Sequence, residues 1–213
     1  MENQYHEEDD LEKLKRWWKD YGSALVIGVV LGTAALFGYR YWNQYQFKQA
    51  ANASALYDQV IYNMKQKHFD KAETIGGQIM EQFDSTPYAG MAALLLAKTS
   101  YDNDKPEDAR RQLRWAMNHA KVTATRHAAR IRLARLIGET GDAAAGLALL
   151  KVDDRGGFES EYSELQGDLL AMQGKTDDAR AAYASALSSN SSREYGAILR
   201  MKIADLGQKE TVQ

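Results

Sequence analysis

An uncharged apolar run from Tyr21 to Tyr39 (YGSALVIGVVLGTAALFGY) constrains this chain more than any other feature. As a helix, the run would reach about 28 Å, close to the roughly 30 Å hydrocarbon core of a bilayer. Indole and phenol rings settle at headgroup depth, where their apolar bodies and polar edges are both satisfied. The sequence therefore predicts a transmembrane helix over residues 21–39, with interfacial anchors at both ends: Trp17, Trp18, Tyr39, Tyr41 and Trp42.

Two other readings of the run fit less well. A buried core helix would leave the flanking aromatic residues unexplained. A cleaved signal peptide normally begins with a short positive segment, whereas the twenty residues before Tyr21 contain seven acidic and four basic residues. The small-residue patterns that could serve for cleavage, at residues 51–55, lie more than ten positions beyond the run. The span is therefore expected to be retained.

Basic residues near the ends of the span predict its orientation. The residues before it contain Lys13, Lys15, Arg16 and Lys19, whereas the twenty after it contain Arg40 and Lys48. Cytoplasmic flanks are enriched in Lys and Arg. We therefore expect a single-pass protein of the bacterial inner membrane, with its N-terminus cytoplasmic and its C-terminal domain periplasmic. The absence of cysteine is compatible with that compartment.

The rest of the chain carries four copies of a helical-hairpin pattern. The clearest copy runs from Gly167 to Leu187, with small residues and a turn former at the offsets of a tetratricopeptide repeat. The equivalent small residues of the four copies are Ala72, Ala109, Gly146 and Ala179, spaced by 37, 37 and 33 residues, against about 34 in the motif. A single hairpin cannot bury its apolar face, but stacked hairpins can. An ordinary helical bundle is the alternative.

These patterns predict an all-α fold, in which a single N-terminal transmembrane helix is followed by a tetratricopeptide-like helical-hairpin solenoid. The expected boundaries follow the changes in composition. They are an acidic cytoplasmic tail with an interfacial helix over 1–20, the span over 21–39, a juxtamembrane helix or linker over 40–50, the periplasmic domain over 51–206, and a flexible C-terminus over 207–213. Residues 1–10 are polar and acidic enough to predict disorder.

The combination of features resembles one known family. An acidic tail, the basic and aromatic patch KRWWKDYGSAL, a span that ends in GYRYWNQYQ and a tetratricopeptide-like domain are together similar to the bacterial ancillary SecYEG translocon subunits. The resemblance implies two protein partners: the SecYEG-type translocon and a membrane-anchored periplasmic chaperone related to prolyl isomerases. It implies no catalytic residues.

Motifs that would indicate catalysis fail on inspection. Gly174-Lys175-Thr176 resembles the end of a phosphate-binding loop, but its distance from Gly167 is wrong and the intervening residues read as helix. The four histidines are scattered, without the acidic neighbours that a metal site needs. We therefore expect no enzyme, no cofactor, no metal and no small-molecule substrate. Nucleic acid is not expected either, because the predicted topology places the basic residues of the domain in the periplasm.

Two sets of residues are candidates for recognition. Small residues spaced by four, four and three positions place a helix-packing face on the span: Ala24, Gly28, Gly32 and Ala35. The repeat phase places a second set on a concave partner surface, where each could instead pack between helices: Tyr57, Ile61, Met64, Met91, Leu94, Lys98, Tyr101, Ile131 and Arg135. The same phase predicts an acidic distal part at Glu161, Glu164 and Asp168.

The expected function is that of a non-catalytic membrane-anchored adaptor of the Sec protein-translocation channel. Its tetratricopeptide-like domain would link the channel to periplasmic chaperones. The alternative is a scaffold in envelope assembly or cell division that uses the same anchor and repeats without contacting the channel.

Overall fold

The computed structural model describes residues 2–189 and 193–208, which form helices joined by short turns and contain no strand. The helices are α1 (Glu2–Lys65), α2 (Phe69–Gln82), α3 (Pro87–Asp102), α4 (Pro106–His119), α5 (Thr123–Glu139), α6 (Ala143–Leu149), α7 (Glu159–Met172), α8 (Thr176–Ser188) and α9 (Arg193–Gln208). The chain divides into two compact units, Met1–Lys48 and Gln49–Gln213, and α1 contributes to both.

The first unit is helical from Glu2 onward, so the prediction of disorder over residues 2–10 is wrong. Glu and Lys favour helices, and acidic residues near a helix N-terminus interact favourably with its dipole. At the other end of the chain, α9 includes residues 207 and 208, and the remainder of the expected flexible C-terminus lies outside the described residues.

The apolar run lies within α1. Among the described residues, one helix is long and apolar enough to cross a membrane, and only 6% of its most apolar stretch is buried within the protein. A core helix of a soluble domain would be covered by neighbouring helices. The exposure of this stretch instead makes it a candidate membrane anchor.

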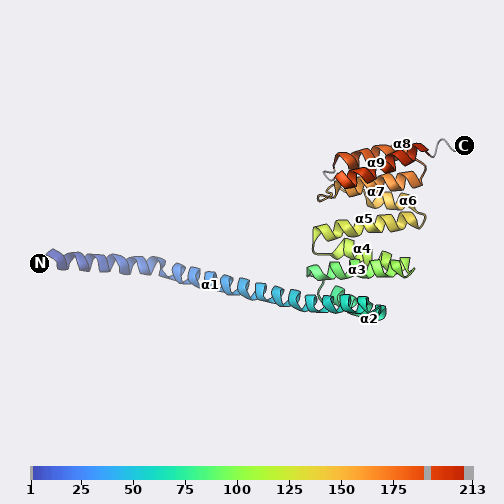
Figure 1. Cartoon of the computed structure of the whole chain (residues 1–213). Helices are drawn as coiled ribbons and strands as arrows, with labels where there is room; N and C mark the ends of the chain where they lie inside the picture. Colours follow the sequence, from blue (N-terminus) through green and yellow to red (C-terminus); the bar gives the residue numbers. More distant parts are fainter. Residues whose placement is uncertain (1, 190–192, 209–213) are drawn as a thin grey trace. The chain divides into compact units, whose positions relative to one another are not determined.

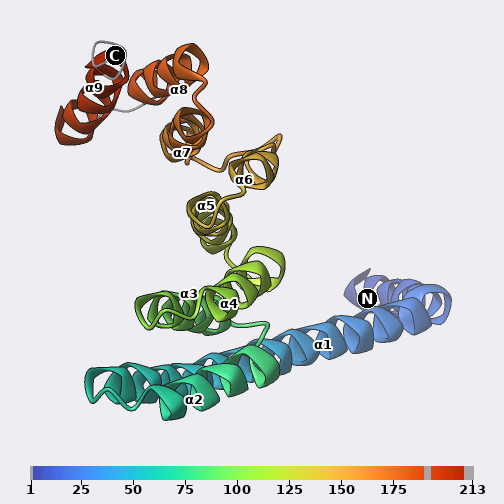
Figure 2. The same cartoon turned by 90° about the vertical axis from the view of Figure 1, so that its right-hand side faces the viewer.

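The second unit is a stack of helical hairpins in chain order (Figure 1). The C-terminal part of α1 packs on α2, and the next pairs are α3 with α4, α5 with α6, and α7 with α8, while α9 packs against α8. Figure 2 shows α5, α6 and α7 almost end-on, each lying beside its neighbour in the stack. The predicted all-α solenoid is confirmed.

Each hairpin turns in the same way. The second residue after the first helix of each hairpin has a positive φ: 58° at Lys67, 56° at Asp104, 104° at Gly141 and 73° at Gly174. The next residue donates its backbone N–H to a carbonyl five positions earlier, as in His68 to Asn63 and Lys105 to Ser100, at 2.9 and 2.8 Å. This is the Schellman ending of a helix, which satisfies carbonyls that would otherwise lack partners.

Five residues after each of these turns stands the small residue that marked the repeat in the sequence. Ala72, Ala109 and Ala179 are at most 1% exposed. Gly146 replaces alanine in the third hairpin, where an added Cβ would lie 2.7 Å from the carbonyl oxygen of Ala134. The two helices of that hairpin therefore approach more closely than a methyl group allows, and α6 can pack on α5 despite its short length.

Candidate interaction site

A largely apolar cavity lies between α3, α4 and α5 of the second unit. We call it the α3–α5 groove. It has a volume of about 350 Å³, within the range of pockets that bind ligands. Its floor is formed by Leu94, Ala97, Ala109, Leu113 and Leu136, and its rim by Lys98, Tyr101, Arg132, Arg135 and Glu139.

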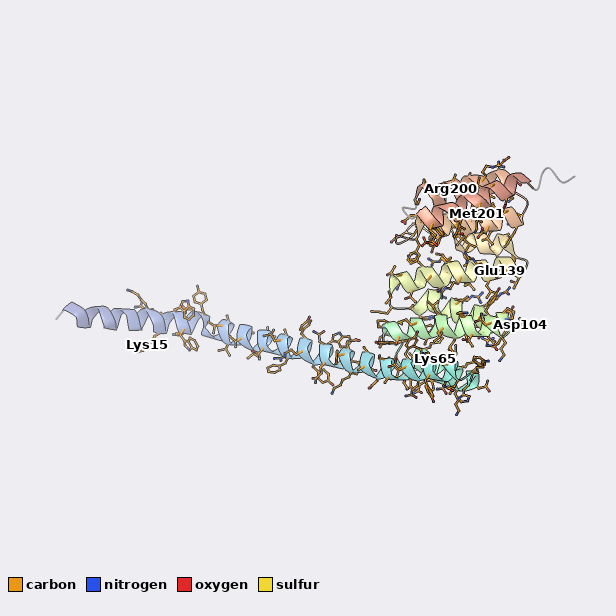
Figure 3. The ribbon with its side chains drawn as sticks, viewed as in Figure 1. Lys15, Lys65, Asp104, Glu139, Arg200 and Met201 are labelled. Atoms are coloured by element: carbon orange, nitrogen blue, oxygen red, sulfur yellow. The ribbon has the colours of Figure 1, made fainter. Side chains whose placement is uncertain are left out.

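Hydrogen bonds fix part of this rim. The hydroxyl of Tyr101 donates to Oε2 of Glu139 over 3.1 Å, which connects the end of α3 to the end of α5. This hydrogen bond, together with the negative charge of Glu139, raises the pKa of Tyr101 above its ordinary value. Lys98 pairs with Asp102 one turn along α3, Nζ to Oδ2, over 2.6 Å. Figure 3 shows Glu139 and Asp104 on the side of the stack where the first helices of the hairpins end.

The structure brings together four residues of the proposed concave surface, because Leu94, Lys98, Tyr101 and Arg135 all line the α3–α5 groove. Ile131 is placed differently. It is 9% exposed and packs in a core cluster with Ala134 and Leu165, so its expected surface position is wrong. On α5 the expected position of Arg135 is exposed, whereas Arg132 is exposed in place of Ile131.

Arg132 and Glu139 also line the groove but were not among the candidate residues. They stand three positions before and four positions after Arg135, which are the neighbouring positions on a helix face. Extending the helical spacing from Arg135 in both directions would have found them. The groove therefore carries two guanidinium groups on one face of α5.

The candidates in the first hairpin lie near the core. Tyr57 and Met64 are partly buried against the cluster that contains Ala72 and Ile79. The ring of Tyr57 lies 5.9 Å from that of Tyr88, centroid to centroid, and the hydroxyl of Thr99 donates to Sδ of Met64 over 3.4 Å. Ile61 is half-buried, whereas Met91 of α3 is 40% exposed. Tyr57 and Met64 therefore join α1 to α2 and α3.

Helix α9 covers most of the acidic positions that were expected to be open. Glu164 is 9% exposed and Asp168 is half-buried, because Lys202 of α9 pairs with both carboxylates. Tyr195 of α9 also donates to Glu164. Burial and these acidic neighbours raise the pKa of Tyr195, and the same causes raise that of Tyr183, whose hydroxyl donates to Asp168 over 2.8 Å.

In the first unit, the proposed interfacial anchors are all exposed: Trp17 45%, Trp18 55%, Tyr39 67%, Tyr41 74% and Trp42 59%. The proposed packing face is also exposed at Ala24, Gly28, Gly32 and Ala35. A Cβ added at Gly28 or Gly32 would meet no atom within 4 Å. Space for the backbone of a second helix is therefore open at these two positions.

Within the described residues, no group of three or more His, Asp or Glu side chains could hold a metal ion. His127 is buried, but its Nδ1 is within 2.8 Å of the Tyr162 hydroxyl and its ring stacks on Phe158. This histidine is thus part of the packing between α5 and α7.

Comparison with known proteins supports the resemblance noted from the sequence. The chain is 29% identical over 206 residues to the ancillary SecYEG translocon subunit of Escherichia coli (strain K12), which covers 97% of this chain and 99% of the relative. It is 28% identical over 200 residues to the protein of the same name from Haemophilus influenzae, with 94% and 97% covered. The Neisseria gonorrhoeae protein of that name is 26% identical over 206 residues, with 94% and 97% covered.

The similarity includes both the apolar helix and the hairpins, and the resemblance to these translocon subunits is confirmed. A family profile described as a tetratricopeptide repeat-like domain matches residues 15–208, which include α2 to α9 and most of α1. The chain therefore belongs to the tetratricopeptide repeat-like domain family.

Proposed function

We propose that this chain is a non-catalytic, single-span adaptor of a Sec-type protein-translocation channel. The observation that carries the proposal is the similarity over nearly the whole chain to proteins named as ancillary SecYEG translocon subunits. Residues 21–39 would span the inner membrane, with residues 1–20 in the cytoplasm. Residues 40–50 would link the span to the periplasmic repeat domain at 51–206.

Each part of the chain would contribute a separate contact. The face formed by Ala24, Gly28, Gly32 and Ala35 would pack against a membrane helix of the channel, since small residues allow close backbone approach in lipid. The repeat domain would bind a membrane-anchored periplasmic chaperone related to prolyl isomerases. The α3–α5 groove supports this second contact, because it is an open, largely apolar site on the repeat domain.

Photocrosslinking in native membranes tests the proposal. A photoreactive phenylalanine analogue at position 28 should yield products that contain channel subunits, and one at Tyr101 should yield products that contain a periplasmic chaperone. Matched positions outside the proposed contacts are Ala34 on the span and Arg114 on α4, which are both exposed. Products that contain only envelope-assembly or cell-division proteins would instead support the scaffold function and contradict the adaptor.

Protease accessibility tests the orientation independently. In spheroplasts, an added protease should digest the repeat domain, while an epitope placed before Glu2 should remain protected until the membrane is opened. Protection of the repeat domain would reverse the proposed topology.

A further inference from the structure

The α3–α5 groove contains two cationic groups that form no ion pair among the described residues, although the charge of Arg135 is near enough to Glu164 to lower the pKa of that carboxyl. Arg132 and Arg135 are exposed on α5, and neither forms an ion pair with another of the residues that the structure describes. Other arginines of the same unit differ. Arg110 and Arg111 each pair with an acidic residue three positions earlier, at 2.9 and 2.6 Å.

The sequence around Arg132 and Arg135 explains why these arginines form no ion pair. The positions three and four away from Arg132 contain no acidic residue. Glu139 stands four positions after Arg135, but the described residues show no ion pair between them, and Oε2 of Glu139 accepts the hydroxyl of Tyr101 instead. Both guanidinium groups therefore remain available beside the apolar floor.

The size of the cavity restricts what can occupy it. A volume of about 350 Å³ lies near the lower end of the range for ligand pockets and suits one or two large apolar side chains. The two acyl chains of a phospholipid need more space. Guanidinium groups bind carboxylates through paired hydrogen bonds, which suits the side chains of Asp and Glu.

We propose that the α3–α5 groove binds a protein segment in which one or two large apolar residues are flanked by Asp or Glu. The apolar side chains fill the floor between Leu94, Leu113 and Leu136, while the acidic ones bind Arg132 and Arg135. This inference deepens the proposed adaptor function and rests on it for the assignment of the occupant to a partner protein.

Binding of short peptides to the purified full-length chain in phosphatidylcholine nanodiscs tests the inference. Fluorescence anisotropy would compare labelled Gly-Glu-Leu-Phe-Glu-Gly with a peptide whose Glu residues are Lys and with one whose Leu and Phe are Ser. The acidic apolar peptide should bind at least about tenfold more tightly than either. The lysine peptide lacks the acidic side chains for the two arginines, and the serine peptide lacks the apolar side chains for the floor. Its affinity should fall as salt is added, since exposed charges are screened.

Charge reversal provides the sharper test. The double variant Arg132→Glu/Arg135→Glu should weaken binding of the acidic peptide by about tenfold or more and strengthen binding of the lysine peptide. Both positions are exposed, so the fold should tolerate the change. The matched control is Arg114→Glu/Lys121→Glu, which alters the net charge equally at exposed positions that do not line the groove and should leave the preference unchanged.

Three outcomes would overturn the inference. They are equal binding of the acidic and lysine peptides, an unchanged preference after Arg132→Glu/Arg135→Glu, and binding of laurate where none of the peptides binds. The last would assign the groove to a single acyl chain. Because these measurements use no channel or chaperone, their failure is distinguishable from failure of membrane photocrosslinking, which tests the adaptor function itself.

Discussion

Lys202 near the middle of α9 lies 2.6 Å from Asp168 of α7, Nζ to Oδ1, and this ion pair joins the last helix to the fourth hairpin. The same ammonium lies 2.7 Å from Oε1 of Glu164, one turn earlier on α7. The three side chains are only 29%, 20% and 12% exposed, respectively. Helix α9 thus covers the end of the stack through a partly buried network, in addition to the apolar contacts of Leu199.

Removing this ammonium should loosen α9. We expect Lys202→Met to lower the free energy of unfolding by about 1–2 kcal/mol, because two partly buried carboxylates lose their counter-charge. Urea denaturation gives the stability, and hydrogen exchange should show the largest loss of protection in α9. The control is Lys98→Met, which removes an exposed pair with Asp102 and should change the stability by less than about 0.5 kcal/mol. Equal effects of the two variants would contradict the structural role of Lys202.

The same network predicts a dependence on pH. Burial raises the pKa of Glu164, but the hydrogen bonds from Lys202 and Tyr195 and the nearby charge of Arg135 outweigh it and hold the pKa below its ordinary value. A carboxylate with a lowered folded-state pKa contributes stability above its unfolded pKa of about 4.3 and loses it as the pH falls through the folded value.

Unfolding in urea should therefore need less denaturant as the pH falls from 5 to 3, and Glu164 should account for part of that change. The variant Glu164→Gln has no titrating group at this position, so its stability should be lower at pH 5 and should fall less toward pH 3. If both proteins lose the same stability over this interval, Glu164 does not contribute to the pH dependence.

The repeats could be predicted from the sequence, whereas the covering of α7 by α9 could not. Each hairpin can be recognised from nearby residues, because a turn residue and a small residue stand five positions apart within one copy. The pairing of Lys202 with Asp168 joins residues 34 positions apart, and no repeat offset links them. Glu164 and Asp168 therefore looked like an open acidic surface until the position of α9 was known.

Only part of the groove could be predicted, because the exposed side of α5 depends on contacts with residues distant in the sequence. Lys98 and Tyr101 follow directly from the helical spacing of α3. On α5 the expected face included Ile131, but burial against α7 turns this residue inward and leaves Arg132 exposed. Adjacent residues point about 100° apart around a helix, so Ile131 and Arg132 face different sides, and the packing of α7 decides which of them is exposed.

The hairpin turns give a prediction about backbone strain. Lys67 and Asp104 adopt a left-handed conformation that side chains with a Cβ disfavour, whereas the other two hairpins have glycine at this position. Lys67→Gly and Asp104→Gly should each stabilise the protein by up to about 1 kcal/mol, and Gly141→Ala and Gly174→Ala should each destabilise it by about the same amount. Thermal unfolding of the four variants measures this. A stabilising effect of Gly174→Ala would show that strain does not govern these turns.

The span gives the last prediction, which concerns the face that contains Gly28 and Gly32. Replacing both with Leu places two bulky side chains where the proposed contact needs close backbone approach, so recovery of channel subunits with the detergent-solubilised chain should fall several-fold. Among the described residues, an added Cβ at either position meets no atom within 4 Å outside the neighbouring backbone of α1 itself. Loss of binding could then be assigned to a neighbouring helix. Ala34→Leu is the control, since it lies about 120° around the helix from Gly28 and adds a similar bulk. Equal recovery with the double variant and the control would remove the proposed contact and would leave residues 21–39 as a membrane anchor alone.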